Sequence, residues 1–173
     1  MSKAKDPKRQ LLGKIARERG QQFEKLIDDA LEYYADKGYA HIEKTPEPMR
    51  PLKPFGDRKH GQFVAVYMKK AQPDYKGTLK GGRSIMFEAK FTADDRMDQD
   101  RVLPGQASYM TRHQLLGARC YVVAGFQSGE VYRVPWEVWD NMKKYFGRKY
   151  VTEADLEKFR VQTAWNGLLM LLD

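Results

Sequence analysis

The chain has 173 residues, 42% of them hydrophobic, which is enough to form one domain with a substantial core. Lysine and arginine number 31 against 23 aspartate and glutamate residues, so the formal net charge is +8 and a polyanionic partner is favoured. A single cysteine gives no basis for a disulfide scaffold or a zinc site, and no stretch resembles a signal peptide or reaches the length of a membrane span. We therefore expect a cytoplasmic protein with no membrane association.

The first 19 residues are basic, with lysine or arginine at Lys3, Lys5, Lys8, Arg9, Lys14, Arg17 and Arg19. We expect a mobile basic arm over residues 1–19, helical from Leu11, followed by a single domain over residues 20–173. The arm serves either to solubilise the chain or to contact DNA. In the second case Arg17 and Arg19 are candidate DNA-binding residues.

The clearest helix pattern runs from Gln21 to Lys37. Apolar residues recur three and four positions apart from Phe23 to Tyr34, as one buried face of a helix requires. Glu24 lies near the edge of this apolar stripe. Its carboxylate is either solvated or reaches into a site between the helix and a sheet.

A short strand is expected over residues 39–44, and the segment 46–61 that follows is rich in proline and basic residues. Its composition predicts a partly extended excursion from the domain surface. This excursion is either a plain surface loop or a protrusion that contacts a ligand. Its candidate DNA-binding residues are Arg50, Lys53, Arg58 and Lys59, and a strand over residues 62–70 should return from it.

The most informative motif places Asp74 ahead of a Glu88-Ala89-Lys90 run, with glycines between them. Residues 84–92 alternate between apolar and polar positions, which predicts a strand with Glu88 and Lys90 on one face. Residues 76–82 read as a turn region, so the segment that holds Asp74 is expected to pair antiparallel with this strand. That pairing would bring Asp74 alongside Glu88.

Two neighbouring carboxylates can hold a hard cation such as Mg²⁺, or Mn²⁺ in its place, and a lysine beside them can meet a phosphate or the attacking water. The motif therefore predicts a metal-dependent site that cuts phosphodiester bonds. An isolated Glu-x-Lys is more often a solvated polar face or a surface ion pair. The upstream aspartate, the glycines and the basic composition favour the catalytic interpretation, and Lys76 is a further candidate DNA contact.

The remaining pattern predicts a loop over 94–101, a helix over 104–116 closed by Gly117, a buried strand over 120–126 with a partner over 130–134, a helix from Pro135, and a capping box over 152–155. Cys120 lies in the apolar strand and is expected to be a buried structural thiol. The apolar tail over 161–172 packs either on the core or on a partner subunit.

This order of elements resembles the restriction-endonuclease-like nuclease core, an α/β fold with a mixed sheet flanked by helices. More narrowly, the chain resembles the RecU family of Holliday junction resolvases from Gram-positive bacteria and their phages. The resemblance covers most of residues 20–160. It is carried by Phe23-Glu24, residues 42–48, Asp74-Tyr75-x-Gly77, Phe87-Glu88-Ala89-Lys90, Gln106 and Gly147-Arg148-Lys149.

The resemblance implies metal ligation by Asp74 and Glu88, with Lys90 at the scissile phosphate. It also implies that Glu24 completes or supports the metal site and that Gln106 lies just behind it. Residues 46–61 would correspond to a basic stalk that enters the centre of a four-way junction. A homodimer is implied as well, since a two-fold symmetric junction needs two symmetric nicks.

The implied function is a Mg²⁺-dependent endonuclease that resolves Holliday junctions by paired nicks in DNA recombination and repair, with a recombinase or a branch-migration helicase as a candidate partner. Two alternatives stay open. One is a nuclease of the same fold that acts on flaps or duplex DNA. The other is a non-catalytic protein that binds branched DNA.

Overall fold

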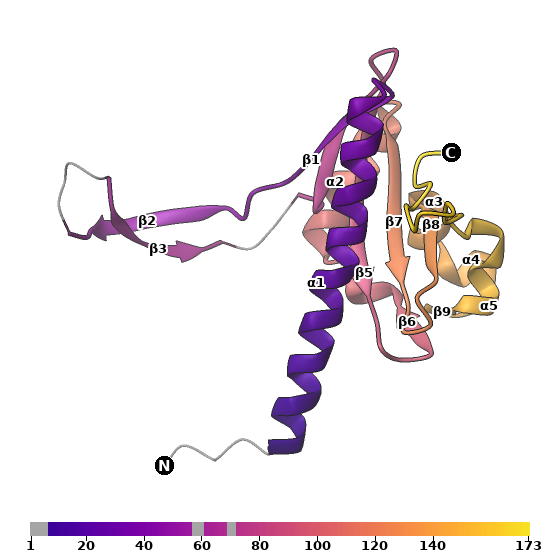
Figure 1. Ribbon diagram of the computed structural model, residues 1–173, viewed down its shortest axis with the longest axis horizontal. Helices are drawn as coiled ribbons and strands as arrows, with labels where there is room; N and C mark the ends of the chain where they lie inside the picture. Colours follow the sequence, from indigo (N-terminus) through magenta and orange to yellow (C-terminus); the bar gives the residue numbers. More distant parts are fainter. Residues whose placement is uncertain (1–6, 57–60, 69–71) are drawn as a thin grey trace.

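A mixed five-stranded sheet forms the centre of the protein, with strands in the order β1-β4-β5-β7-β8 (Figure 1). The structure, a computed structural model, describes residues 7–56, 61–68 and 72–173, and side chains from residue 18 onward. The strands of the sheet are β1 (Ala40–Lys44), β4 (Tyr75–Leu79), β5 (Ser84–Phe91), β7 (Arg119–Gly125) and β8 (Val131–Pro135). Among these five strands of the described chain, β5 and β7 pair in parallel and the other neighbours pair antiparallel.

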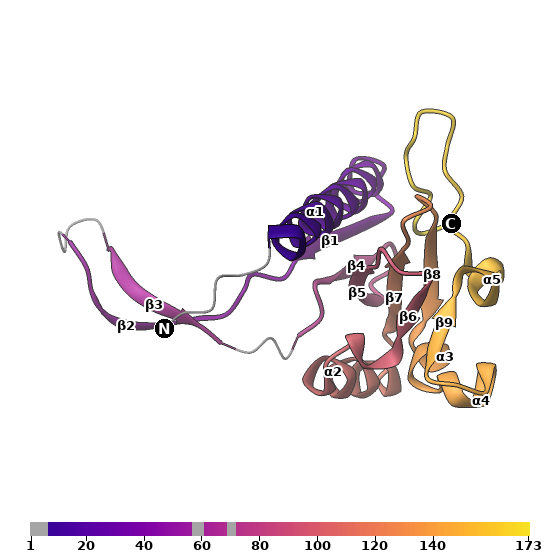
Figure 2. The same cartoon turned by 90° about the horizontal axis from the view of Figure 1, so that it is seen from below.

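Helices cover both faces of this sheet. The helix α1 (Pro7–Asp36) lies on one face, and α2 (Pro104–Leu115), α3 (Trp136–Asp140) and α4 (Met142–Phe146) lie on the other (Figure 2). A small sheet of β6 (Arg96–Asp98) and β9 (Tyr150–Thr152), together with α5 (Glu153–Leu156), completes the second layer. The predicted α/β class, a mixed sheet flanked by helices, is confirmed.

The core is divided in two by the sheet because successive strand residues point to opposite faces. Ile85 and Phe87 of β5 are buried against α1, whereas Met86 is buried with residues of α2 and α3. Val123 and Val122 of β7 divide in the same way. Glu88 falls on the α2 face, where an apolar residue would continue the pattern, and this places a carboxylate in the interior.

The helix α1 begins at Pro7, so the part of the arm expected to be helical from Leu11 and the helix expected from Gln21 form one continuous helix. Proline suits the first turn of a helix, because the amide hydrogen that it lacks has no partner there. The N-terminal part of α1 extends beyond the sheet (Figure 1), whereas the stripe from Phe23 to Tyr34 is buried on it. Nothing in the described residues separates an arm from the helix at residue 19, and the division into an arm and a domain stays a prediction.

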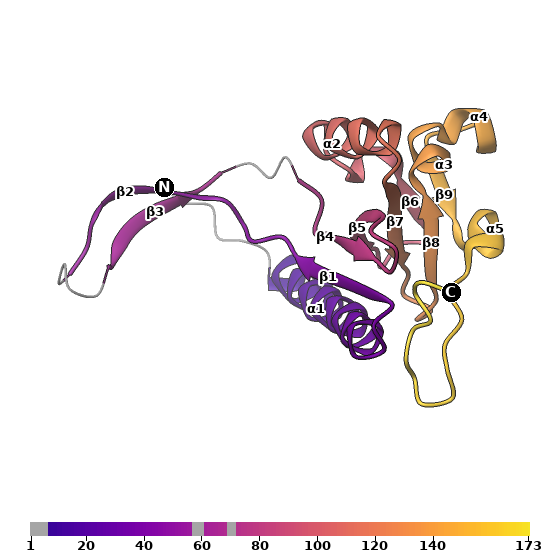
Figure 3. The same cartoon turned by 90° about the horizontal axis from the view of Figure 1, so that it is seen from above.

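The excursion after β1 is a two-stranded hairpin of β2 (Met49–Pro54) and β3 (Phe63–Tyr67), which projects far from the sheet (Figures 1 and 3). The strand expected to return from the excursion is thus part of it, and the protrusion is longer than residues 46–61. Pro51 and Pro54 are tolerated because each lies on a strand with a free edge. Every residue of β2 is exposed, so the hairpin has no core of its own.

Two expectations for loops are wrong. Residues 76–79 belong to β4, and the turn is confined to the residues around Gly81 and Gly82, both at positive φ. Gly77 allows β1 and β4 to approach closely, since a Cβ there would overlap the His41 carbonyl oxygen. Residues 94–101 include β6 and a 3-10 turn (Gln99–Arg101), because pairing with the distant β9 extends the chain.

The other expected elements lie within one or two residues of their predicted bounds. Gly117, at positive φ, follows α2, and the capping box from Thr152 to Asp155 is present. Cys120 is buried, which raises the pKa of its thiol to about 11. The C-terminal tail packs on the core through Val161, Leu169 and Leu171, which join the cluster of α1. Across the described residues, no helix is long and apolar enough to span a membrane.

Candidate active site

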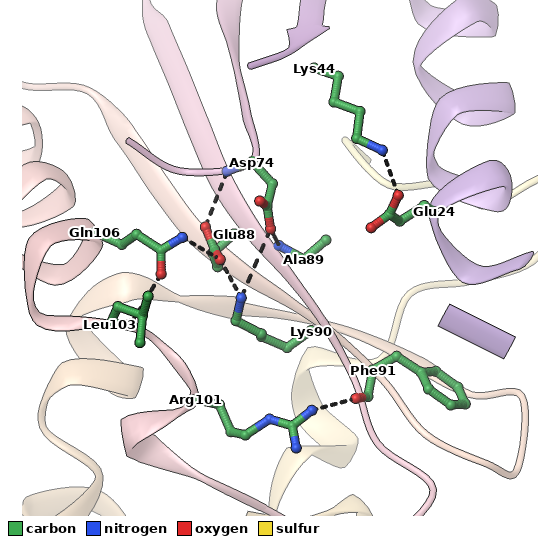
Figure 4. Close-up of polar contacts among 10 residues, drawn as sticks. All are labelled: Glu24, Lys44, Asp74, Glu88, Ala89, Lys90, Phe91, Arg101, Leu103 and Gln106. Carbon is green, nitrogen blue, oxygen red and sulfur yellow. Dashed lines mark hydrogen bonds and ion pairs between the residues drawn. The ribbon is translucent and has the colours of Figure 1, made fainter. Parts of the chain in front are cut away.

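Two carboxylates meet where β4 begins beside β5 (Figure 4). The strands pair antiparallel with Tyr75 opposite Phe87, so Asp74 lies next to Glu88. The amide of Asp74 donates to Glu88 Oε2 at 3.1 Å, and the amide of Ala89 donates to Asp74 Oδ2 at 3.2 Å. Each carboxylate is thus held by the backbone of the neighbouring strand.

Glu88 is fully buried, with no exposed surface. Burial raises the pKa of Glu88 above its usual range, the Lys90 ammonium opposes this shift, and the Asp74 carboxylate adds to it. The Lys90 ammonium contacts Glu88 Oε1 directly and lies 4.0 Å from Asp74 Oδ2. A buried carboxylate needs such compensation, because an unpaired charge in the interior is costly.

Gln106 supplies the second support for Glu88. Its side-chain amide donates to Glu88 Oε1 at 2.7 Å, and its carbonyl oxygen accepts the amide of Leu103 at 3.0 Å (Figure 4). Gln106 is itself buried at the start of α2. The amide is therefore oriented from both ends and holds Glu88 in one conformation.

The site is open on the side of Asp74 and Lys90. Their side chains are 16% and 20% exposed, whereas Glu88 has none of its side chain exposed. Solvent therefore reaches the Lys90 ammonium and the Asp74 carboxylate, which form the exposed side of the site. Lys90 and Asp74 are therefore placed where they can meet a substrate, while Glu88 is held in the interior.

Glu24 is not brought into this cluster. Its carboxylate pairs with the Lys44 ammonium at 2.5 Å, and Figure 4 shows both apart from Asp74 and Glu88. Within the described ranges, no three histidine, cysteine or acidic side chains gather closely enough to hold a metal ion. The carboxylates of the site are therefore a pair, and the role predicted for Glu24 stays a prediction.

The donor set of the pair nevertheless fits a hard divalent cation. Asp74 and Glu88 contribute carboxylate oxygens, the donors that Mg²⁺ prefers. Ala89, between Glu88 and Lys90, can add its main-chain carbonyl oxygen, and the side chains of the described residues that donate hydrogen bonds to Glu88 are an ammonium and an amide. The residues present match magnesium or manganese better than zinc.

The candidate DNA-binding residues lie in three places. Arg50 and Lys53 are exposed on β2, opposite Val66 and Val64 of β3 and therefore on one face of the hairpin. Lys76 lies on β4, two residues after Asp74, and its ammonium donates to the side-chain oxygen of Gln72 at 2.9 Å. Arg19 is partly exposed on α1. Arg58, Lys59 and the side chain of Arg17 lie outside the described residues.

Three residues beside the site were not predicted to belong to it. Lys44 holds Glu24, Arg101 donates to the Phe91 carbonyl oxygen at 2.8 Å, and Thr45 donates its amide to the Asp74 carbonyl oxygen at 2.7 Å. Thr45 is buried, and its hydroxyl has no hydrogen-bond partner among the described residues. Lys44 ends β1 and Thr45 follows it, where the chain leaves for the hairpin, and that position in the chain was the available signal.

A mixed sheet flanked by helices, with one acid at the start of a strand and a Glu-x-Lys on its antiparallel neighbour, defines a protein of the restriction-endonuclease-like class. Residues 18–172 match the family model described as "Recombination protein U". The chain belongs to the RecU family.

The chain is similar to several known proteins. A Holliday junction resolvase RecU from Streptococcus gordonii is 34% identical over 121 residues, which are 68% of this chain and 60% of that protein. One from Streptococcus pneumoniae (strain P1031) is 30% identical over 146 residues, 82% of this chain and 72% of that protein. The match thus spans only about 60% of the length of the first of these relatives. A solved structure, the Holliday junction resolvase Hjc of Archaeoglobus fulgidus, gives a TM-score of 0.46 with 13% identity, over 81% of this chain and 88% of that one.

Proposed function

We propose that this protein is a Mg²⁺-dependent endonuclease that cuts four-way DNA junctions by paired symmetric nicks, in DNA recombination and repair. The observation that carries the proposal is the Asp74–Glu88 pair with Lys90 in contact, at the base of a hairpin that projects from the domain. Family membership supports the same substrate, because the relatives are named Holliday junction resolvases.

The residues of the site divide the chemical work. Asp74 and Glu88 would bind the cation through their carboxylate oxygens, with the Ala89 carbonyl as a further ligand. A bound Mg²⁺ lowers the pKa of a water ligand and polarises a phosphoryl oxygen. Gln106 keeps the Glu88 carboxylate in place, so that the cost of orienting it is met before substrate arrives.

Lys90 is the substrate-facing group of the site. Its ammonium is held against Glu88 and is still partly exposed, so it can contact the scissile phosphate. There it would orient the attacking water or stabilise the negative charge that grows in the transition state. In-line attack on phosphorus breaks the bond to the 3′ oxygen, which takes up a proton, and leaves a 5′-phosphate and a 3′-hydroxyl.

The choice of a junction rather than plain duplex would come from shape. The hairpin of β2 and β3 presents Arg50 and Lys53 at a distance from the site, where they can contact phosphates without reading bases. A homodimer would place two such sites on a two-fold symmetric junction. A recombinase or a branch-migration helicase is a candidate partner for this activity.

The test is cleavage of an immobile four-way junction compared with linear duplex of the same sequence, with Mg²⁺ or with EDTA. Wild type should give paired symmetric nicks in the junction only, and Asp74→Ala should bind the junction without cutting it. Equal cutting of duplex would favour a general nuclease. Tight binding by wild type without any cut would favour the non-catalytic alternative.

A further inference from the structure

Behind the two carboxylates, on the α1 face of the sheet, two aromatic rings lock β4 to β5. Tyr75 and Phe87 are direct partners in the strand register, and their rings stack with centroids 4.8 Å apart at an interplanar angle of 16°. Both are buried, with at most 1% exposed. Each ring belongs to the residue next to an acid, since Tyr75 follows Asp74 and Phe87 precedes Glu88. The stack therefore fixes the spacing of the strands where the acids meet.

Tyr75 is also tied to α1. Its hydroxyl donates to Asp28 Oδ1 at 2.8 Å. A buried hydroxyl without a partner would be costly, and Asp28 provides the acceptor. Asp28 itself is exposed on the helix surface, so its role is not to fill the core. The contact joins the helix directly to the first residue of the strand that follows Asp74.

A second contact of α1 lies one helical turn away. Lys44, the residue opposite Tyr75 in the register of β1 and β4, pairs with Glu24 at 2.5 Å. Glu24 and Asp28 are four residues apart and so lie on one side of the helix. Together they contact Lys44 of β1 and Tyr75 of β4, where the chain leaves the sheet for the hairpin and returns from it. The helix therefore anchors the base of the hairpin, and Asp74 is the residue immediately before Tyr75.

We propose that Asp28 and Tyr75 are positioning residues for Asp74, holding the start of β4 so that the Asp74 carboxylate keeps the orientation that binds the catalytic cation. This inference rests on the proposed function. Groups that orient a metal ligand from behind typically change metal affinity or activity by about 10- to 100-fold when they are removed. Neither residue is among the proposed ligands of the cation, so their effect on the cation passes through Asp74.

The experiment measures Mn²⁺ binding to the full chain without DNA by isothermal titration calorimetry, alongside junction affinity and melting temperature. Tyr75→Phe keeps the ring stack and removes only the hydroxyl, and Asp28→Ala removes its acceptor. Both should weaken Mn²⁺ binding by about tenfold or more and leave junction affinity unchanged. Asp28→Asn, which keeps an acceptor oxygen, should restore most of the affinity.

The matched control is Asp29→Ala, one residue along the same helix, where an exposed carboxylate pairs only with Lys25 at 2.9 Å among the described residues. It should bind Mn²⁺ as wild type does. The proposal is overturned if the folded Asp28→Ala variant binds Mn²⁺ within twofold of wild type, even when its melting temperature falls, or if wild type binds no Mn²⁺. Wild type that binds Mn²⁺ but cuts no junction would refute the proposed function and leave the comparison of affinities intact.

Discussion

Replacing Gln106 by alanine tests whether the buried amide prepares Glu88 for catalysis. The substitution removes the 2.7 Å hydrogen bond to Glu88 Oε1 and leaves the Leu103 amide without its acceptor. A hydrogen bond to a charged group contributes about 1.5–3 kcal/mol. If that whole contribution serves to hold Glu88 in the reacting complex, the rate of cleavage falls by about 10- to 150-fold, at about 1.4 kcal/mol for each factor of ten.

The assay is single-turnover cleavage of a four-way junction at saturating Mg²⁺, so that neither junction binding nor product release limits the rate. Gln114→Ala is the matched control, because its side chain lies on the same helix and has no hydrogen-bond partner among the described residues. It should cut like wild type. A folded Gln106→Ala variant that cuts within twofold of wild type would refute the reasoning, since the amide would then have no part in orienting Glu88.

Three further predictions concern the sheet, the capping box and the hairpin. Gly77→Ala should lower the free energy of unfolding by about 3 kcal/mol or more, because its Cβ meets the β1 backbone; a loss below about 1 kcal/mol in chemical denaturation would contradict the close approach. Burial would raise the pKa of Asp155, but hydrogen bonds from Thr152 and Arg148 outweigh it and lower the pKa. The stability that Asp155 adds is therefore present above about pH 4 and is lost as pH falls through its lowered pKa, so the melting temperatures of wild type and Asp155→Asn should converge in acid. Arg50→Ala and Lys53→Ala should each reduce the slope of log affinity for a junction against log salt by about one, with cleavage of the bound junction unchanged; an unchanged slope would place these side chains away from DNA.

The catalytic strand could be predicted because its signal is local. Alternation over residues 84–92 is enough to place Glu88 and Lys90 on one face, and antiparallel pairing across a glycine-rich turn brings Asp74 to them. The contact of Gln106 with Glu88 depends on how α2 packs on the sheet. The residues around Gln106 give no local signal for that packing, and only the family resemblance placed Gln106 behind the site.

The residue pattern predicts other elements incorrectly, in part because one residue type can have two structural uses. The sequence predicts that Gly77 belongs to a turn, but it lies in β4 and serves the close approach of two strands. Residues 96–98 form a strand because they pair with residues 150–152, more than 50 positions away, and a polar composition hides such pairing. The sequence predicts helix from Leu11 in the arm and a separate helix from Gln21, whereas α1 runs unbroken from Pro7, because the basic segment before Gly20 carries no strong apolar stripe that would show the continuity.

The position of Glu24 depends on a balance that residue patterns cannot resolve. Its ion pair with Lys44 joins two side chains that are each nearly half exposed, and such pairs contribute only about 0–1 kcal/mol. A divalent cation bound by Asp74 and Glu88 would also attract the Glu24 carboxylate. Even with some water between them, this attraction is similar to or larger than that of the Lys44 ion pair. The ion pair with Lys44 therefore opposes a move of Glu24 toward the cation by at most about 1 kcal/mol. Replacing Lys44 by methionine, which removes the competing charge but keeps the length of the side chain, shifts that balance toward the cation and should strengthen metal binding if Glu24 is a ligand.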